Sequence, residues 1–181
     1  MPTSEEPPFD LGQPLRPFRL PEPLTGRLVG PEDFPEAQAI LVAFLCNGCP
    51  DVQHVAGALA ALTRDLELEG LRTLAVNSAE DAPGDVAAEA LRRRYVFPYL
   101  IDQTQAVARA YGAVCAPDFY LFDRRRRLAY HGRFDDTRPG GRPAHGGELK
   151  RAALQVLSGQ PGPAQQIPAR GCGLWPALAG D

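Results

Sequence analysis

The hydrophobic pattern singles out one unbroken apolar run in the first third of the chain. Residues 39–45 are all apolar, and the segment Cys46-Asn47-Gly48-Cys49-Pro50 follows them directly. Such a run is typical of a strand buried on both faces, as in a parallel sheet. Over residues 52–69 the apolar positions then recur at intervals of three and four, which predicts an amphipathic helix. Two cysteines therefore lie where a buried strand turns into a helix.

The pattern continues as an alternation of strands and helices. Two short strands near residues 18–20 and 27–29 precede the apolar run. After the helix we expect strands at 71–77 and 98–102, helices at 86–94 and 104–111, a hairpin of strands 119–122 and 128–131, and a last helix with its apolar stripe over 149–157. Alternation of this kind implies βαβ crossovers, and the hairpin adds antiparallel strands. The sequence thus predicts an α/β fold with a central mixed β-sheet flanked by helices.

The two ends of the chain differ from the part between them. Residues 1–17 carry five prolines, too many for a regular element, and are expected to form an extended N-terminal arm. The predicted domain spans residues 18–159. Residues 160–181 are rich in proline and glycine and contain Cys172 and the only tryptophan, Trp175. We expect this C-terminal tail to pack on the domain, with Trp175 as a candidate anchor.

Composition limits the classes of function. The chain has 181 residues, 44% of them hydrophobic, and a net charge of −3, which argues against a dedicated nucleic-acid binder. No apolar run approaches the roughly 20 residues of a membrane span, and the acidic start does not resemble a secretory signal. The expected protein is cytoplasmic, a monomer or weak dimer, without nucleic-acid or membrane partners. In that compartment a Cys-x-x-Cys pair is more often catalytic or metal-binding than structural.

The position of the two cysteines suggests redox chemistry. The free N–H groups and the dipole at the start of a helix stabilise negative charge, so Cys46 is expected to ionise easily. A thiolate is the nucleophile of disulfide exchange, and Cys49 is placed to resolve the mixed disulfide. Zinc is disfavoured because one cysteine pair and three scattered histidines lack the usual paired spacing. No glycine motif for a dinucleotide is present, so no metal and no cofactor are expected.

Four ordered segments resemble a known family. They are Phe44-Leu45-Cys46-Asn47-Gly48-Cys49-Pro50, then residues 111–119 (YGAVCAPDF), residues 133–136 (RFDD) and residues 171–175 (GCGLW). Together they resemble the thioredoxin-like branch of the AhpC/TSA (redoxin) superfamily that has a Cys-Asn-x-Cys-Pro active site. This resemblance implies a thioredoxin-like fold with N- and C-terminal extensions. It also implies a cis peptide bond before Pro117, which would present the backbone of Ala116 to a substrate strand.

The resemblance further implies a thiol–disulfide oxidoreductase that serves antioxidant or redox homeostasis. Cys46 would attack a disulfide in a protein or small-molecule substrate, Cys49 would release the product, and an external thiol reductant would restore the pair. The first alternative is a thiol peroxidase of the same superfamily that uses Cys46. It is weakened because the Pro-x-x-x-Thr-x-x-Cys pattern of peroxiredoxins is missing before Cys46. The second is a metal-binding chaperone that holds copper or zinc with Cys46 and Cys49.

Two more cysteines remain outside this pair. Cys115 lies two residues before Pro117, and Cys172 lies in the tail. One hypothesis is that the tail folds back and pairs Cys172 with Cys115 as a second redox or structural pair. Two unpaired structural thiols are the other interpretation, because spacing alone cannot show that the two Cα atoms come within bridging distance.

Overall fold

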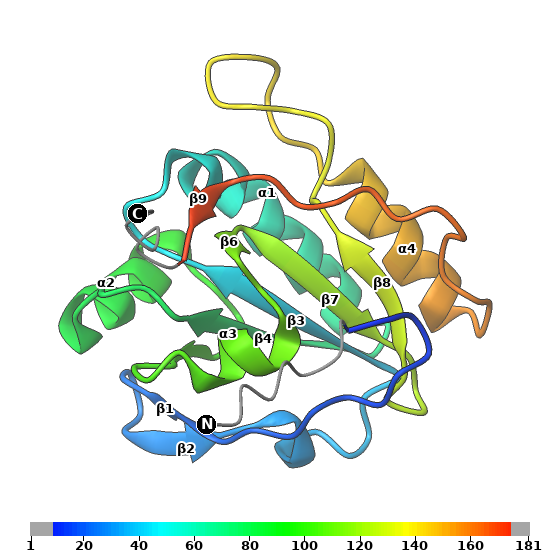
Figure 1. Ribbon diagram of the computed structural model, residues 1–181, viewed down its shortest axis with the longest axis horizontal. Coiled ribbons are helices and arrows are strands. Elements are labelled where there is room, and N and C mark those ends of the chain that lie inside the picture. Colours follow the sequence, from blue (N-terminus) through cyan, green and yellow to red (C-terminus); the bar gives the residue numbers. More distant parts are fainter. Residues whose placement is uncertain (1–8, 175–181) are drawn as a thin grey trace, which may run out of the picture.

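The computed structural model describes residues 9–174. Its main sheet has five strands in the order β5-β4-β3-β7-β8, with helices on both faces (Figure 1). The elements in chain order are β1 Leu20–Glu22, β2 Arg27–Val29, the 3₁₀-helix η1 Pro31–Asp33, β3 Ala39–Leu45, α1 Pro50–Glu67, β4 Leu71–Asn77, α2 Pro83–Arg93, β5 Tyr99–Ile101, α3 Ala106–Tyr111, β6 Cys115–Ala116, β7 Asp118–Phe122, β8 Leu128–Gly132, α4 Gly147–Leu157 and β9 Cys172–Gly173.

The apolar run forms β3, the middle strand of the sheet. It pairs in parallel with β4 along its whole length and antiparallel with β7 over residues 40–44. All seven of its residues are fully buried. A strand in this position is covered by helices or loops on both faces, which explains why it has no polar alternation. The predicted α/β fold with a mixed sheet is confirmed.

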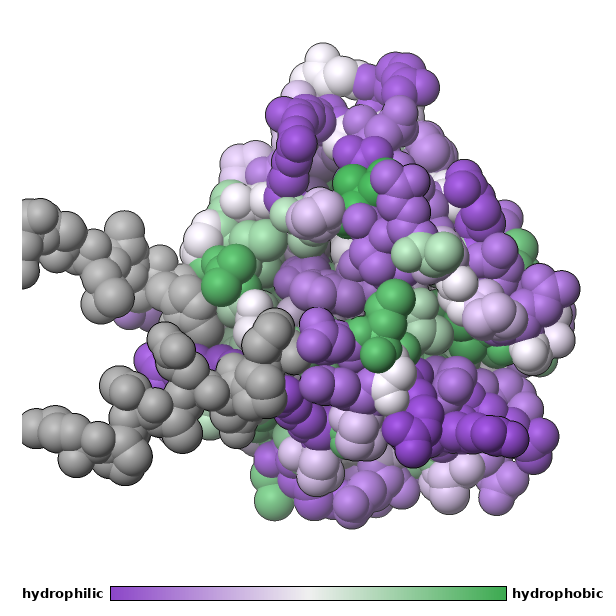
Figure 2. All heavy atoms as spheres, turned by 45° about the vertical axis from the view of Figure 1, so that its right-hand side comes forward, coloured by the Kyte–Doolittle hydropathy of each residue, from purple (hydrophilic) through white to green (hydrophobic). Residues whose placement is uncertain are grey.

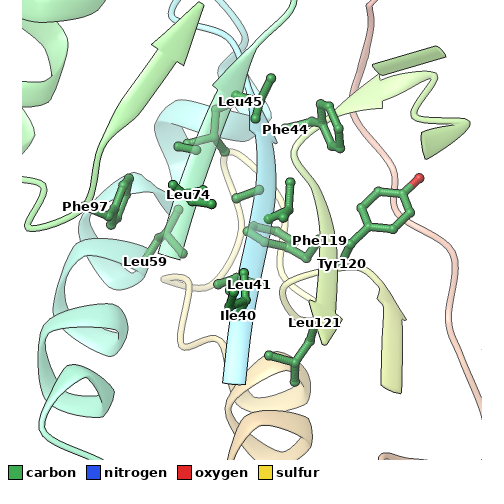
Figure 3. Packing of buried hydrophobic residues seen from close by; sticks show 14 of the residues in the cluster. Ile40, Leu41, Phe44, Leu45, Leu59, Leu74, Phe97, Phe119, Tyr120 and Leu121 are labelled. Atoms are coloured by element: carbon green, nitrogen blue, oxygen red, sulfur yellow. The ribbon is translucent and has the colours of Figure 1, made fainter. Parts of the chain in front are cut away.

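Each face of the sheet has its own cover. On one face Phe44 and Tyr120 pack with Tyr111 of α3 and with Phe9 of the N-terminal arm, their rings 5.1–5.9 Å apart in successive pairs. The other face carries Phe119, and Figure 3 shows this side chain beside Leu41 of β3. Here α1 and α4 lie next to each other, since Gly146 at the start of α4 abuts the side chain of Leu62 in α1.

Most predicted elements are present with small shifts of their ends. The apolar positions of the predicted amphipathic helix are buried in α1, but the helix begins earlier, at Pro50; these positions are Val52, Val55, Ala56, Leu59, Leu62 and Leu66. Strand β1 lies two residues later than expected, and the short pieces η1, β6 and β9 were not predicted. Trp175, the predicted anchor of the tail, lies outside the described residues. No helix within residues 9–174 is both long and apolar enough to cross a membrane.

The end of the described chain runs back over the domain. After α4 it passes along β8, where the backbone N–H of Arg133 donates to the carbonyl of Ile167 over 3.1 Å, and it ends as β9 beside β6 (Figure 1). The tail therefore connects the far end of the sheet to the loop that precedes β7.

The outer face seen in Figure 2 is mostly hydrophilic, with separate small hydrophobic patches.

Candidate active site

The Cys46-x-x-Cys49 pair lies at the junction between β3 and α1. Cys46 follows the last residue of β3, and Cys49 is the N-cap of α1, whose first residue is Pro50. The side chain of Cys46 is partly exposed, whereas only 2% of Cys49 is exposed. The backbone N–H of Cys49 donates a hydrogen bond to the sulfur of Cys46. The junction thus carries one partly exposed thiol, Cys46, and one buried sulfur, Cys49.

The environment of Cys46 opposes ionisation. Burial raises its pKa to about 11, and the carboxylates of Asp81 and Asp51 raise it further, against the hydrogen bond from Cys49. The expectation of an easily ionised thiol is therefore wrong. The favourable start of the helix is outweighed because the sulfur is partly removed from water and faces two acidic side chains.

A polar network fixes the turn between the two cysteines. Asp81 accepts hydrogen bonds from the backbone N–H of Asn47 over 2.9 Å and from the side-chain amide of Asn77 over 2.8 Å. The Tyr99 hydroxyl donates to the Asn47 side chain over 2.9 Å. Sequence analysis missed these residues. The available signal was that Asn77 ends the strand next to β3, and parallel strands end at one edge of a sheet.

The loop before β7 lies against Cys49. The peptide bond between Ala116 and Pro117 is cis, as the resemblance implied. The sulfur of Cys49 lies 3.3 Å from the carbonyl oxygen of Ala116, which is fully buried. A groove next to Pro117 is lined by Asp51 and His54 of α1 and by residues 133–138. The predicted substrate-binding residues, Ala116 and Pro117, are thus adjacent to the cysteine pair.

The tail brings a third cysteine to this site. Cys172 forms a disulfide with Cys49, with 5.9 Å between their Cα atoms and a sequence separation of 123. Cys46 and Cys115 are free thiols. The structure therefore lacks the disulfide expected between Cys46 and Cys49, and instead shows Cys49 bonded to a residue from the tail.

The hypothesis of a Cys115–Cys172 pair is also wrong in this structure. Strands β6 and β9 do bring the two segments together, but the register pairs Ala116 with Cys172 and Cys115 with Gly173. Paired residues of neighbouring strands point to the same face, and successive residues point to opposite faces. Cys172 therefore shares the face of Ala116, where Cys49 lies, and Cys115 points away from it.

Cys115 has its own buried acidic neighbour. Asp118 is 3% exposed, and its carboxylate is 3.0 Å from the imidazole of His131. Burial raises the pKa of Asp118, and His131 opposes that effect. Burial together with Asp118 and Asp51 raises the pKa of Cys115 to about 11. This thiol is therefore held protonated near neutral pH.

Two clusters of candidate metal ligands occur among the described residues. In one, the sulfurs of Cys49 and Cys172 lie close to the carboxylate of Asp51. While these sulfurs form a disulfide they provide no thiolate for a metal. The other cluster is formed by Asp135, Asp136 and His145. Asp135 already accepts hydrogen bonds from the backbone N–H groups of His145 and Gly146, each over 2.7 Å.

Comparisons with known proteins agree with this geometry. The model of the Redoxin family matches residues 10–144. The structure of a hypothetical protein from Sinorhizobium meliloti 1021 is 43% identical, with a TM-score of 0.89 over 93% of this chain and 96% of that one. The comparison with curated proteins found no match.

More distant structures share the fold. A proposed thiol:disulfide interchange protein DsbE from Chlorobium tepidum is 22% identical, with a TM-score of 0.68 over 82% of this chain and 99% of that one. The peroxidoxin BcpB from Mycobacterium tuberculosis is 17% identical, with a TM-score of 0.64 over 83% and 97%. The fold is that of thioredoxin-like proteins. Within that class, the chain belongs to the Redoxin family.

Proposed function

We propose that this protein is a thiol–disulfide oxidoreductase that reduces disulfides in proteins or small molecules. The thiolate of Cys46 attacks one sulfur of the substrate disulfide, and the other substrate sulfur leaves as a thiol. Cys49 then attacks the sulfur of Cys46, which releases the second substrate thiol and leaves an intramolecular disulfide. An external thiol reductant returns the protein to the reduced state.

One observation carries this proposal. Cys49 is buried and held in a disulfide, while Cys46, three residues earlier, is a partly exposed free thiol. A reachable nucleophile next to a buried sulfur that already takes part in disulfide chemistry is the arrangement that exchange requires. A groove lies beside Pro117, in the loop whose Ala116 carbonyl contacts the sulfur of Cys49.

Burial and the charges around Cys46 support reduction of the substrate as the direction of electron flow. Proteins of this class become strong oxidants when the thiolate of the reduced form is stabilised. Here burial and the carboxylates of Asp81 and Asp51 disfavour that thiolate. The reduced form therefore gains little from ionisation, which favours giving electrons to a substrate over withdrawing them.

The test compares two substrates in the same preparation. Purified protein is supplied with dithiothreitol as electron donor and with either insulin or hydrogen peroxide. We expect reduction of the insulin disulfides well above the uncatalysed rate, loss of this activity in Cys46→Ser and Cys49→Ser, and retention in Cys115→Ser. Faster consumption of peroxide than of insulin disulfides would replace this proposal with the peroxidase. Stoichiometric copper or zinc in protein purified without oxygen, together with inactivity on both substrates, would support the metal-binding chaperone.

A further inference from the structure

We propose that Cys172 is a third redox-active cysteine, which takes the disulfide over from the Cys46–Cys49 pair and presents it to the external reductant. This inference rests on the proposed function and assigns to the tail a role in the same cycle. It starts from the observed disulfide, in which Cys49 is bonded to Cys172 and Cys46 is left free.

The tail is held at a defined position beside the cysteine pair. Strand β9 pairs with β6, so that Cys172 lies opposite Ala116 (Figure 1). Leu174, two residues after Cys172, is 5% exposed, and its backbone N–H donates to the carbonyl of Val114 over 3.0 Å. The side-chain amide of Gln105 donates to the carbonyl of Leu174 over 3.1 Å. These contacts fix β9, and with it Cys172, against the segment of residues 114–116.

Gly171 also contributes to this position of the tail. A Cβ atom at this position would overlap the carbonyl oxygen of Ala116. The backbone of the tail can therefore approach the loop of Pro117 this closely only because residue 171 has no side chain. The same carbonyl lies 3.3 Å from the sulfur of Cys49. The close approach thus brings the tail to the place where the buried sulfur lies.

Cys49 is the residue that contacts both Cys46 and Cys172. Its backbone N–H contacts the sulfur of Cys46, and its side chain is bonded to Cys172. Because Cys49 is 2% exposed, another molecule has poor access to it. Cys172 is partly exposed on the opposite side of this disulfide. An external thiol therefore reaches the disulfide most directly at Cys172.

The exchange is balanced within the chain. The thiolate of Cys172 attacks the sulfur of Cys49 in the Cys46–Cys49 disulfide, the bond between Cys46 and Cys49 breaks, and the bond between Cys49 and Cys172 forms. Cys46 leaves as a thiolate and takes up a proton, so the number of disulfides is unchanged. Protonation of Cys46 is favoured near neutral pH because its pKa is raised to about 11. The Cys49–Cys172 disulfide that results is the one seen in the structure.

The consequence is a division of labour. Cys46 serves the substrate, whereas Cys172 serves the reductant, and Cys49 connects them. After each exchange Cys46 is a free thiol again while the oxidising equivalent is stored between Cys49 and Cys172. The electrons of the reductant then reach the site through the tail.

The experiment follows the disulfide in time. Fully reduced protein carrying Cys115→Ser is mixed with one equivalent of 2-hydroxyethyl disulfide, quenched with acid at increasing times, alkylated and mapped by peptide mass spectrometry. We expect a Cys46–Cys49 disulfide first, followed by its replacement with Cys49–Cys172 at about tenfold excess. In the variant that also carries Cys172→Ser, the first disulfide should persist, and its reduction by dithiothreitol should be about tenfold slower.

The outcomes separate this inference from the proposed function. A Cys46–Cys49 disulfide that persists while Cys172 remains alkylatable overturns the role of Cys172 and leaves the oxidoreductase intact. Regeneration of Cys172→Ser by dithiothreitol at the rate of its parent also overturns it. If no variant reacts with the 2-hydroxyethyl disulfide, the oxidoreductase is contradicted, and diamide then serves as the oxidant. After diamide, a Cys49–Cys172 disulfide with free Cys46 still supports the exchange, and a stable Cys46–Cys49 disulfide contradicts it.

Discussion

Strand β3 and the tail from residue 160 to residue 174 reach the same site in opposite ways. Every residue of β3 is fully buried, and the strand is hydrogen-bonded to a neighbour on each side. The tail is largely exposed and is held at separate points, such as the hydrogen bond of 2.7 Å from the His131 backbone N–H to the side chain of Gln166. One segment is placed by burial of its side chains, the other by close contacts of its backbone.

The difference bears on what each segment can do. A strand in the middle of a sheet opens only when the whole domain unfolds, whereas a segment with few buried side chains can open locally. The cysteine next to β3 is therefore held in a fixed position. We expect the cysteine in β9 to approach and leave while the sheet stays folded, which suits an exchange partner.

The largest effect should come from the two cysteines themselves. Cys46→Ser removes the nucleophile and should lower the rate of insulin reduction by about a thousandfold or more. Cys172→Ser should leave the first oxidation of the reduced protein unchanged and slow only its regeneration. The measurement is single-turnover oxidation by 2-hydroxyethyl disulfide, compared with steady-state turnover. Equal losses of the first oxidation step in both variants would contradict the assigned roles.

A matched pair of leucine truncations should separate the two regions in stability. Leu41 is fully buried in β3, and Leu41→Ala should lower the free energy of unfolding by about 2–5 kcal/mol. Leu174 is also buried, but the tail can detach before the core unfolds, so Leu174→Ala should cost less than about 1 kcal/mol. Urea denaturation of the reduced proteins, followed by circular dichroism, measures both values. Similar losses would show that tail and core unfold together.

Two glycines of the tail, one as the test and one as its control, allow the position of Cys172 to be perturbed separately from the rest of the site. In Gly171→Ala the new methyl group overlaps the carbonyl of Ala116, so β9 should move away and the fraction of oxidised protein with the Cys49–Cys172 disulfide should fall about tenfold. Gly162→Ala is the control, because its methyl group overlaps the carbonyl of Ala129, far from Cys172 in sequence. Peptide mapping after diamide oxidation gives the fractions. Equal fractions of the Cys49–Cys172 disulfide in both variants would contradict the role of Gly171 in positioning Cys172.

The smallest effect concerns the charge beside Cys46. In oxidised Cys115→Ser protein, Cys46 is the only free thiol, and its pKa of about 11 means that alkylation by iodoacetamide should rise about tenfold per pH unit from pH 7 to pH 10. Asp81→Asn removes one of the carboxylates that raise this pKa, so alkylation at pH 7 should become several-fold faster. Asp85→Asn, an exposed position, is the control for net charge. An unchanged rate of alkylation in Asp81→Asn would contradict the claim that Asp81 raises the pKa of Cys46.

The sequence predicted the parts of the fold that depend on side-chain burial. The apolar run of β3 and the spacing in α1 are direct consequences of where these residues pack, so both elements were found. Strands β6 and β9 have two residues each, too few for any periodic pattern, and they were missed. They are held by backbone contacts, which leave little trace in side-chain chemistry.

The candidate site was predictable in its location but not in its connections. The cysteine pair and the cis peptide bond at Pro117 follow from motifs. The partner of Cys172 depends on the register between β6 and β9. In the observed register Cys172 lies opposite Ala116, and a shift by one residue would place it opposite Cys115 instead. Four cysteines permit several pairings, and sequence spacing does not choose among them. The raised pKa of Cys46 depends on its burial and on Asp81, which reaches the site from the loop after β4.

A redox titration tests the central claim most directly. Protein carrying Cys115→Ser is equilibrated in thiol–disulfide buffers of graded potential, free thiols are trapped, and each disulfide is located by peptide mapping. The account predicts one reversible two-electron transition in which Cys49 is oxidised, bonded to Cys172 at equilibrium, with Cys46 free. A Cys49 that stays reduced across the whole range, or a disulfide that never reopens at reducing potentials, would contradict a redox role for this site.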